Sequence, residues 1–267
     1  MSNKLLFLGT GPVGGVSGRG RTKRLETSTL IKTSKGNILI DVSEDFSKQS
    51  KLIGKIDAVL ITHGHRDAIG GMPQLRIWLN SQLRSQKSQA SPSEAGRAKV
   101  KSQKLPLYTL GVTVEYIKNK FKQVDFLEFH PLKSFKSFKL FNIKIIPFEV
   151  SHSIQKGFPT LGFKFYFPDG YKLIYISDTG GWNNKVQNLI SGSDLLILDG
   201  AMWGKKLISH LDIKKIIPRA KDWGINKLIF TQIGRTVPPY EIFKKELWKI
   251  WTKASPAYDD LEILLEK

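Results

Sequence analysis

Short apolar runs recur along the chain, and most of them end at a residue that forms turns or carries chemistry. Roughly four to six apolar residues bounded in this way are typical of buried strands, because a strand inside a packed sheet is covered on both faces. The predicted strands are Leu5–Leu8, Ile38–Ile40, Ala58–Ile61, Pro106–Thr109, Leu173–Ile176, Leu195–Leu198 and Leu228–Phe230. Several of these runs are followed at once by a polar residue, namely Asp41, Thr62, Ser177, Asp199 and Thr231.

Other segments between these strands have apolar residues three and four positions apart, the spacing of amphipathic helices. The predicted helices are Ile69–Leu79, Val112–Phe121, Val186–Ile190, Ile213–Trp223 and Tyr240–Trp251. Three further segments lack this period and are interpreted as an antiparallel meander: Phe135–Leu140, Ile143–Val150 and Leu161–Phe167. Strands mixed with helices predict an α/β protein, which tends to have its site at the carboxyl ends of its strands.

The segment 80–104 interrupts this regular pattern. Ten of the 24 residues from Ser81 to Lys104 are Ser or Gln, and the only aliphatic residues larger than Ala are Leu83 and Val100. We interpret 80–104 as an exposed, basic insertion, expected to be mobile, that joins a helix to the strand at Pro106–Thr109. Because candidate site residues lie on both sides of it, residues 1–267 are expected to form a single domain.

The composition narrows the possible chemistry. The 267 residues include 42 Lys and Arg against 23 Asp and Glu, which gives a formal net charge of +19, and there is no cysteine. The lack of cysteine excludes a disulfide scaffold, a thiol nucleophile and a Cys-ligated zinc, so any metal must be held by His and carboxylates. No apolar run reaches the length of a membrane span or a signal-peptide core, so we expect no membrane segment and a cytoplasmic location.

The positive charge is concentrated in two parts of the chain. Residues 1–40 contain seven Lys or Arg and one Glu, and residues 81–104 contain six Lys or Arg and one Glu. Such clustering is typical of proteins that bind a polyanion, of which nucleic acid is the commonest. A lysine-rich surface that is simply solvated explains the composition equally well, so charge alone leaves both interpretations open.

The first predicted strand is followed by a glycine-rich loop, Gly9–Gly14, with the spacing of a dinucleotide-binding motif. That motif requires a helix to begin within it, so that the helix N-terminus can hold a pyrophosphate. The chain instead continues through Gly15, Gly18 and Gly20 without apolar periodicity, which predicts neither a helix nor a dinucleotide site. The loop can still face an anion with its backbone amides and with Arg19, Arg21, Lys23 and Arg24.

Histidine and aspartate residues follow several of the predicted strands. His63 and His65 are separated by one glycine in a turn, so both imidazoles can point at one ion, and Asp67 can reach a neighbouring position. His152 and Asp178 each follow another predicted strand. Three imidazoles and one carboxylate satisfy a four-coordinate zinc ion, or hold one through three ligands with a bridging carboxylate and a water.

Taken in order, these residues resemble the successive motifs of the metallo-β-lactamase fold. The motifs that carry the resemblance are Thr62–Asp67, His152, Ser177–Thr179 and Ser209–Leu211. Leu6–Gly11 and Ala257–Ile263 are similar to the opening and closing strands of the branch that contains RNase Z and the phosphoribosyl cyclic phosphodiesterases. The resemblance implies an α/β fold of the αββα type, with two mixed β-sheets packed face to face and helices on the outer faces.

The resemblance also implies roles for individual residues. The metal ligands it implies are His63, His65 and His152 for the first ion, Asp178 as a bridge, and Asp67 for a second ion. His210 stands where this branch has a histidine that protonates the leaving oxygen, so His210 and Asp67 are the expected catalytic residues. The metal would supply an activated water for hydrolysis.

The sequence departs from the family pattern at two positions of the second metal site. Asp67 is followed by Ala68 where the family has histidine, and Gln232 stands where the family has a second histidine. The ligands that remain there are Asp67, Asp178 and the side-chain carbonyl oxygen of Gln232. A site made only of oxygen atoms favours Mg²⁺ or Mn²⁺ or stays empty, so we expect one tightly held zinc ion. Arg235 is expected to pair with Asp67 or to hold a substrate phosphate. The expected substrate-binding residues are Arg19, Arg21, Arg235 and Gln232.

Simpler interpretations of single residues remain open. Asp67 can cap the following helix, and His210 can be a helix-entry residue. Asp199 can be a turn residue or can support a neighbouring site residue. His130 has no motif around it and is expected to be structural.

The leading functional hypothesis is a metal-dependent phosphodiesterase or nuclease, because His210 and the basic segments favour a phosphate-bearing substrate. The expected partners are a nucleic acid or nucleotide, with a second copy of the chain also considered. One alternative keeps the fold and changes the substrate to a small ester, thioester or lactone. Another is a non-catalytic nucleic-acid-binding protein, for which Ala68 and Gln232 argue.

Overall fold

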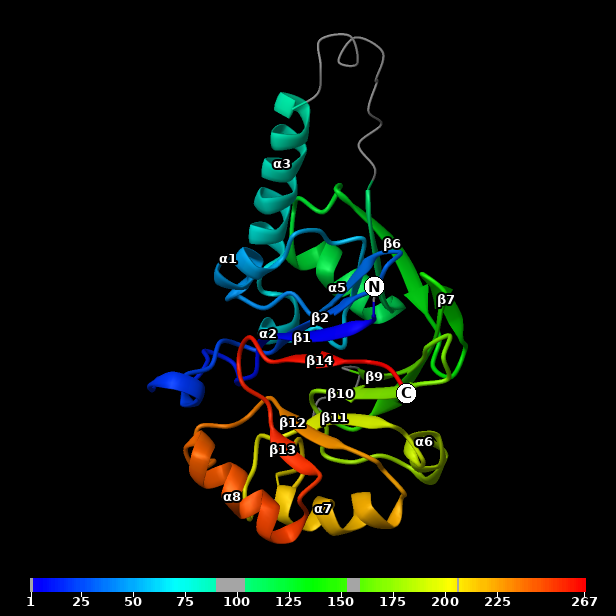
Figure 1. The fold of residues 1–267 in the computed structure, drawn as a ribbon. Helices are drawn as coiled ribbons and strands as arrows, with labels where there is room; N and C mark the ends of the chain where they lie inside the picture. The colour runs from blue at the N-terminus through cyan, green and yellow to red at the C-terminus, as the bar shows by residue number, and fades with distance from the viewer. Residues whose placement is uncertain (1, 90–103, 153–158, 206) are drawn as a thin grey trace.

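Two β-sheets of seven strands each lie side by side in the centre of the molecule, with helices on the outside (Figure 1). The computed structural model describes residues 2–89, 104–152, 159–205 and 207–267. This arrangement is the αββα sandwich with two mixed sheets that the sequence resemblance implies, and that prediction is confirmed.

The first sheet has the strand order β14-β1-β2-β3-β4-β5-β6. Its strands are β1 (Lys4–Gly9), β2 (Ser28–Lys32), β3 (Asn37–Ile40), β4 (Ala58–Leu60), β5 (Leu105–Leu110), β6 (Leu127–Leu132) and β14 (Glu262–Leu264). The pairs from β14 to β3 are antiparallel, and the pairs from β3 to β6 are parallel. The carboxyl ends of β3, β4 and β5 therefore meet at one edge.

The second sheet has the order β13-β12-β11-β10-β9-β8-β7. Its strands are β7 (Phe138–Leu140), β8 (Ile143–Val150), β9 (Thr160–Tyr166), β10 (Lys172–Ile176), β11 (Leu195–Asp199), β12 (Leu228–Thr231) and β13 (Ala254–Pro256). β7, β8 and β9 form the predicted antiparallel meander, and β10 to β13 pair in parallel.

Side chains of the central strands alternate between two cores. Leu5 and Phe7 of β1 belong to the core between the sheets, and Leu6 and Leu8 belong to the core beneath the first helical layer. The same alternation in β10 sends Tyr175 inward between the sheets. Successive strand residues point to opposite faces, and both faces are buried here, which explains why these strands read as continuous apolar runs in the sequence.

The helices cover the outer face of each sheet. Their bounds are α1 (Phe46–Gln49), α2 (Arg66–Ile69), α3 (Met72–Gln89) and α5 (Gly111–Lys120) over the first sheet, and α6 (Asn184–Ile190), α7 (Ile213–Asp222) and α8 (Tyr240–Ile250) over the second. Two short 3-10 helices complete the described elements: η1 (Gly20–Thr22) and η2 (Ser50–Leu52). No helix of the described segments is long and apolar enough to span a membrane.

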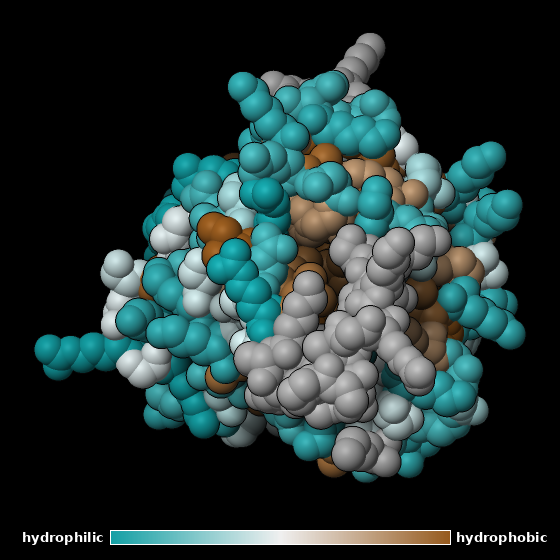
Figure 2. Space-filling view, turned by 90° about the horizontal axis from the view of Figure 1, so that it is seen from above, coloured by the Kyte–Doolittle hydropathy of each residue, from teal (hydrophilic) through white to brown (hydrophobic). Residues whose placement is uncertain are grey.

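Helix α3 differs from its prediction. The predicted helix Ile69–Leu79 is divided into α2 and α3 at Gly70 and Gly71, and α3 continues to Gln89, ten residues beyond the expected end. The interpretation of residues 80–104 as an insertion without a helix is therefore wrong for 80–89, and 90–103 lie outside the described residues. Figure 1 shows α3 projecting from the body of the molecule, and Figure 2 shows mostly hydrophilic side chains on that end, with apolar patches near its centre.

Candidate metal centre

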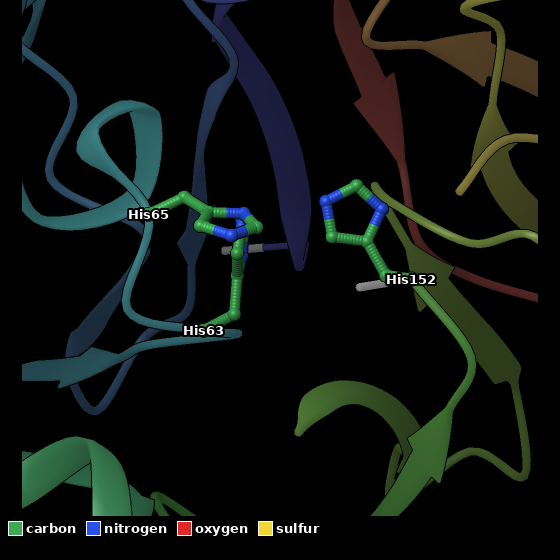
Figure 3. A group of neighbouring side chains, drawn as sticks. All are labelled: His63, His65 and His152. Carbon is green, nitrogen blue, oxygen red and sulfur yellow. The ribbon is translucent and has the colours of Figure 1, made fainter. Parts of the chain in front are cut away.

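The candidate site residues gather where strands of both sheets end. His63 and His65 follow β4, His152 follows β8, Asp178 follows β10 and Gln232 follows β12. Figure 3 shows the imidazoles of His63 and His65 facing that of His152 from the other sheet. The two sheets thus bring together residues that are up to 169 positions apart in the chain.

The three histidines form one compact cluster. One ring nitrogen from each of His63, His65 and His152 lies within 4.8 Å of the others. The centroid of the His63 ring is 4.6 Å from that of His65 and 5.2 Å from that of His152, and the rings are nearly perpendicular. Three imidazole nitrogens this close to one another can bind the same ion.

Hydrogen bonds on the outer side of the cluster fix which nitrogen of two histidines is free. Nδ1 of His152 donates to the carbonyl oxygen of Ser209 at 2.9 Å. The Thr62 hydroxyl donates to Asp41 at 2.8 Å, so its oxygen accepts from Nδ1 of His63, also at 2.8 Å. Both histidines therefore carry their proton on Nδ1 and leave Nε2 as a ligand atom, and such outer partners are typical of metal-binding histidines.

Burial keeps two of these imidazoles uncharged. Burial lowers the pKa of His63, and the neighbouring His152 and His210 lower it further against the opposing effect of Asp178 and Asp67. Burial, with His63 and His152 close by, also lowers the pKa of His65 to about 4. Both side chains are therefore neutral at pH 7, which is the form that binds a metal ion.

The carboxylate side of the centre is held by a side-chain amide. Nε2 of Gln232 donates to Oδ2 of Asp67 and to Oδ1 of Asp178, each at 2.8 Å. The other oxygen of Asp67 lies 3.7 Å from Nε2 of His63, and Oδ1 of Asp178 lies 3.8 Å from Nε2 of His152. Asp67 lies in the first turn of α2 without capping it, so the interpretation of Asp67 as a helix cap is wrong.

The two carboxyl groups differ in their proton affinity. Burial and the nearby Asp178 raise the pKa of Asp67. Burial would also raise the pKa of Asp178, but His152, His63 and His210 outweigh it and lower the pKa to about 2. Asp178 is therefore the permanent negative charge of the centre, and Asp67 is the more basic carboxylate.

His210 is held beside the cluster by a buried aspartate. Its ring centroid is 5.0 Å from that of His152, and its Nδ1 donates to Oδ2 of Asp199 at 2.7 Å. Asp199 also accepts from the backbone N–H groups of Thr179 and Ala201. Burial lowers the pKa of His210, but the hydrogen bond and charge of Asp199 outweigh burial and raise the pKa to about 9. His210 is therefore protonated at pH 7.

From the sequence alone, His210 and Asp199 each also had a simpler structural interpretation. Asp199 supports a site residue rather than serving as a turn residue. Asp212, and not His210, caps α7 by accepting a hydrogen bond from the N–H of Lys214.

Two of the cationic residues considered for the site make other contacts. Arg235 does not pair with Asp67, because its guanidinium donates to the carbonyl oxygen of Val13. Arg24 is buried and donates to Thr10 and to the carbonyl oxygen of Ala257, so the expectation that it faces an anion is wrong.

The two remaining arginines of the glycine-rich loop lie at the surface. Arg19 is exposed, and the Arg21 guanidinium lies 4.2 Å from the ring centroid of Tyr258 and 4.0 Å from the carboxylate of Glu241. No helix begins in the loop before Gly20, as predicted. The loop contacts the segment that follows Gln232, because the N–H of Ile233 donates to the carbonyl oxygen of Thr10.

Sequence reasoning missed some residues that support the centre. It gave no role to Asp41, which anchors Thr62, although an aspartate directly after an apolar strand is the same signal that singled out Asp178. The sequence also could not indicate that the Ser209 carbonyl accepts a hydrogen bond from His152, because any residue type can supply a backbone carbonyl. His130 stacks on Tyr108 with ring centroids 4.6 Å apart, and it lies outside the cluster as expected.

A pocket adjoins the histidine turn. It has a volume of about 300 Å³ and is lined by Gly64 between the two histidines, and by Val112, Tyr116 and Asn119 of α5. Val112 and Tyr116 are 50% and 38% exposed, so this pocket offers apolar surface next to the centre.

Three imidazoles beside a carboxylate fit a metal ion of the zinc type. Nε2 of His63 and Oδ1 of Asp67 are buried polar atoms without a hydrogen-bond partner, and they face the same space. Leaving the His63 nitrogen unpaired costs about 1–3 kcal/mol, which a ligated ion would offset. At the second position, one atom each of His63, Asp67 and Asp178 lie within 4.8 Å of one another, but Ala68 offers no ligand atom and the amide of Gln232 donates to one oxygen of each carboxylate.

Comparison with known proteins agrees with this geometry. A diphosphatase from the PhnP family has 26% sequence identity and a TM-score of 0.80, covering 98% of this chain and 97% of that one. Zinc-bound PqqB from Methylobacterium extorquens has 17% identity and a TM-score of 0.76, over 97% and 99% of the two chains. Human tRNase Z, short form, has 17% identity and a TM-score of 0.69, over 99% and 100%. The last two likenesses show the fold.

One curated sequence relative carries a different name. An octanoyltransferase from Porphyromonas gingivalis (strain ATCC BAA-308 / W83) is 24% identical over 251 residues, which are 92% of this chain and 46% of that protein. The chain thus spans about half the length of this curated relative.

The model of the β-lactamase superfamily domain matches residues 36–233. The matched region contains every residue of the centre, from Asp41 to Gln232, and makes up well over half of the chain. The chain therefore belongs to the family of β-lactamase superfamily domains and has the metallo-β-lactamase fold.

Proposed function

We propose that this chain is a metal-dependent phosphodiesterase that acts on a nucleic acid or a nucleotide. The observation that carries the proposal is the pair of His210 and Asp199 beside the histidine cluster. A phosphodiester needs an acid to protonate its leaving oxygen, and Asp199 keeps His210 in the acid form at neutral pH. A proton donor next to a metal-ligand cluster is what such a hydrolase requires.

The metal belongs to the histidine side of the centre. His63, His65 and His152, with Asp178, would hold one zinc ion. Zinc bound there would act as a Lewis acid and would lower the pKa of a water to about 7.

The chain's own residues then divide the proton transfers. Asp67 has one unpaired oxygen and a raised pKa, so it can accept the proton of the attacking water. As the water oxygen bonds to phosphorus and the ester oxygen leaves, His210 gives its proton to the leaving oxygen. Asp199 orients His210 by its hydrogen bond and stabilises its positive charge.

The substrate class rests on charge and on likeness. The net charge of +19 favours a phosphate-bearing polymer, and exposed cations such as Arg19 would add salt-dependent affinity. The similar diphosphatase supports phosphate chemistry on this fold. Because the octanoyltransferase relative is matched over only about half its length, acyl substrates belong in the test rather than in the proposal.

A substrate panel tests the proposal. Zinc-loaded protein is given an RNA oligonucleotide, bis-p-nitrophenyl phosphate, an octanoyl thioester and a lactone, and initial rates are compared with those of His210→Ala. We expect hydrolysis of both phosphodiesters, with a much larger loss for His210→Ala on RNA, whose leaving oxygen needs a proton. Faster hydrolysis of the thioester or lactone would support the small-ester alternative. Salt-dependent RNA binding without turnover on any substrate would support the non-catalytic alternative.

A further inference from the structure

The side chain of Gln232 lies between the two carboxylates of the centre. Its Nε2 makes two hydrogen bonds of 2.8 Å, one to Asp67 from the first sheet's side and one to Asp178 from the second. The residue is 3% exposed. The amide therefore links the two halves of the molecule at the point where their negative charges meet.

The orientation of this amide follows from its neighbours. A carboxamide nitrogen has two N–H donors, and both carboxylate oxygens are pure acceptors at neutral pH. The opposite orientation would set Oε1 against two carboxylate oxygens without a proton between them. In the orientation present, Oε1 is buried and has no hydrogen-bond partner, so the amide gives up one favourable contact to keep the two donors on the carboxylates.

The backbone of Gln232 is also in an unusual conformation. Its φ is +54°, in the left-handed region that side-chain-bearing residues rarely adopt. Such a conformation costs on the order of 1–3 kcal/mol and persists only where the surroundings require it. The strand end of β12 is thus bent so that this amide reaches the two carboxylates.

The carboxylates of Asp67 and Asp178 are buried, and one oxygen of each lies within 4.8 Å of the other, so their negative charges repel. A metal ion, a shared proton or a hydrogen-bond donor can each reduce their repulsion. The position that follows Asp67 holds Ala68, which has no donor or ligand atom. Gln232 supplies the donor instead, and its amide nitrogen lies against one oxygen of each carboxylate, where a second cation would bind.

We propose that Gln232 is a positioning residue that stands in for a second metal ion, so that the centre takes a single ion. Its amide holds Asp67 and Asp178 together and leaves Oδ1 of Asp67 turned toward Nε2 of His63, 3.7 Å away. The inference rests on the metal-binding part of the proposed function and is independent of the substrate.

Metal counting tests this inference directly. Zinc per chain is measured by elemental analysis, and Mn²⁺ binding to the zinc-loaded protein is measured by electron paramagnetic resonance. We expect one zinc and no Mn²⁺ site in the wild type. Gln232→Glu exchanges the donor for a third carboxylate, and A68H combined with Q232H supplies two imidazoles; each should bind a second divalent ion at least about tenfold more tightly than the wild type.

Gln49 provides a matched control. It is a fully buried glutamine whose Nε2 donates to the carbonyl oxygen of Glu26, away from the centre. Gln49→Glu places a new carboxylate in a buried site without affecting Asp67 or Asp178, so its metal count should stay at one. A gain of Mn²⁺ in this control equal to that of Gln232→Glu would contradict a role specific to Gln232.

The possible outcomes separate this inference from the proposed function. Two ions per chain in the wild type would overturn the inference and leave the proposed hydrolysis standing. Folded variants at both positions that still bind one ion would overturn it as well. If the variants fail to fold, the wild-type count still decides. One zinc in a chain that hydrolyses no phosphodiester would support the inference and contradict the proposed function.

Discussion

The histidine side and the carboxylate side of the centre are stabilised in opposite ways. On the histidine side, the hydrogen bonds lie outside the cluster: Thr62 holds His63, and the Ser209 carbonyl holds His152. The inner nitrogen of His63 has no hydrogen-bond partner. On the carboxylate side, the hydrogen bonds lie inside, because Gln232 joins Asp67 to Asp178.

Under the proposed single-ion centre, this difference explains how one side can bind an ion while the other side does not. A buried polar atom without a hydrogen bond is costly. The histidine side, whose hydrogen bonds lie on its outer face, therefore gains stability when its inner nitrogens bind an ion. The carboxylate side, whose oxygen atoms already accept hydrogen bonds from Gln232, does not need an ion. The predictions below therefore ask whether each side responds to substitution as its hydrogen bonds imply.

The largest effect is expected on the histidine side. His63→Ala removes one of three imidazole ligands, so zinc content should fall below one per chain and kcat should drop at least about 10³-fold, the equivalent of several kcal/mol of Lewis-acid stabilisation. Chelation of the wild type should give the same loss, reversed by zinc. Elemental analysis and initial rates measure both.

His130→Ala is the matched control for that experiment. His130 stacks on Tyr108, and its Nε2 lies 3.2 Å from the carboxylate of Glu128, outside the cluster. It should keep one zinc and nearly full activity. Equal losses in the two variants would show that histidine removal acts through general stability, and not through the ligand set.

The sequence predicted most of the fold because so many strands are buried on both faces. One strand that it missed, β2, is buried on both faces but is not apolar throughout. β2 starts with Ser28 and Thr29, which are buried but make hydrogen bonds to the Asp41 carbonyl and to the Tyr175 hydroxyl. Polar residues satisfied by distant partners look like a loop in a hydrophobicity pattern.

The end of α3 was missed for a different reason. Residues after Leu79 are almost all polar, so the apolar spacing that marks an amphipathic helix stops there. Gln, Arg and Lys nevertheless have high intrinsic helix propensity, and the helix continues to Gln89. Periodicity detects the buried part of a helix and says little about a part that projects away from the core.

The candidate site was predictable where residue type decides the chemistry and unpredictable where orientation does. Histidines in the order of a known family motif indicate a group of metal ligands. Gln232 was expected to offer its carbonyl oxygen to a second ion or to bind substrate, yet its nitrogen faces the centre. Its partners lie 165 and 54 residues away, so only the assembled sheets reveal which end of the amide faces inward.

The carboxylate side should respond to substitution without losing the metal. Asp67→Asn keeps the shape of the side chain but removes the basic oxygen that accepts the proton of the attacking water. We expect kcat to fall about 10²-fold, within the usual range for a general base, while zinc stays at one per chain. Elemental analysis and kcat on the same preparation measure this.

Loss of zinc in Asp67→Asn would break the comparison, because it would make Asp67 a ligand of the tightly held ion. Unchanged kcat would remove Asp67 from the reaction. Asp45→Asn is the matched control: Asp45 is an aspartate whose carboxylate accepts from the N–H of Glu26 and pairs with Lys48, outside the centre. It should change neither the zinc count nor kcat.

The smallest effect is expected one contact further out, at Asp199. This carboxylate raises the pKa of His210 to about 9 against the opposing effect of burial. The acid form is the active one, so wild-type kcat/KM on RNA should stay level at neutral pH and fall as the pH rises through about 9. Asp199→Asn removes the charge, so the pKa of His210 drops to or below its ordinary value of about 6.5, and the fall begins at lower pH.

The two leaving groups separate this effect from simple misfolding. On RNA at neutral pH, Asp199→Asn should lose about tenfold in kcat/KM, and the loss should shrink as the pH falls below the new pKa and His210 is protonated again. On bis-p-nitrophenyl phosphate, whose nitrophenolate leaves without a proton, the loss should be much smaller at every pH. Equal losses on both substrates, independent of pH, would mean that Asp199 only supports the local fold. A pH-dependent loss confined to RNA would instead place proton donation on the His210 side of the centre, apart from the carboxylates that Gln232 joins.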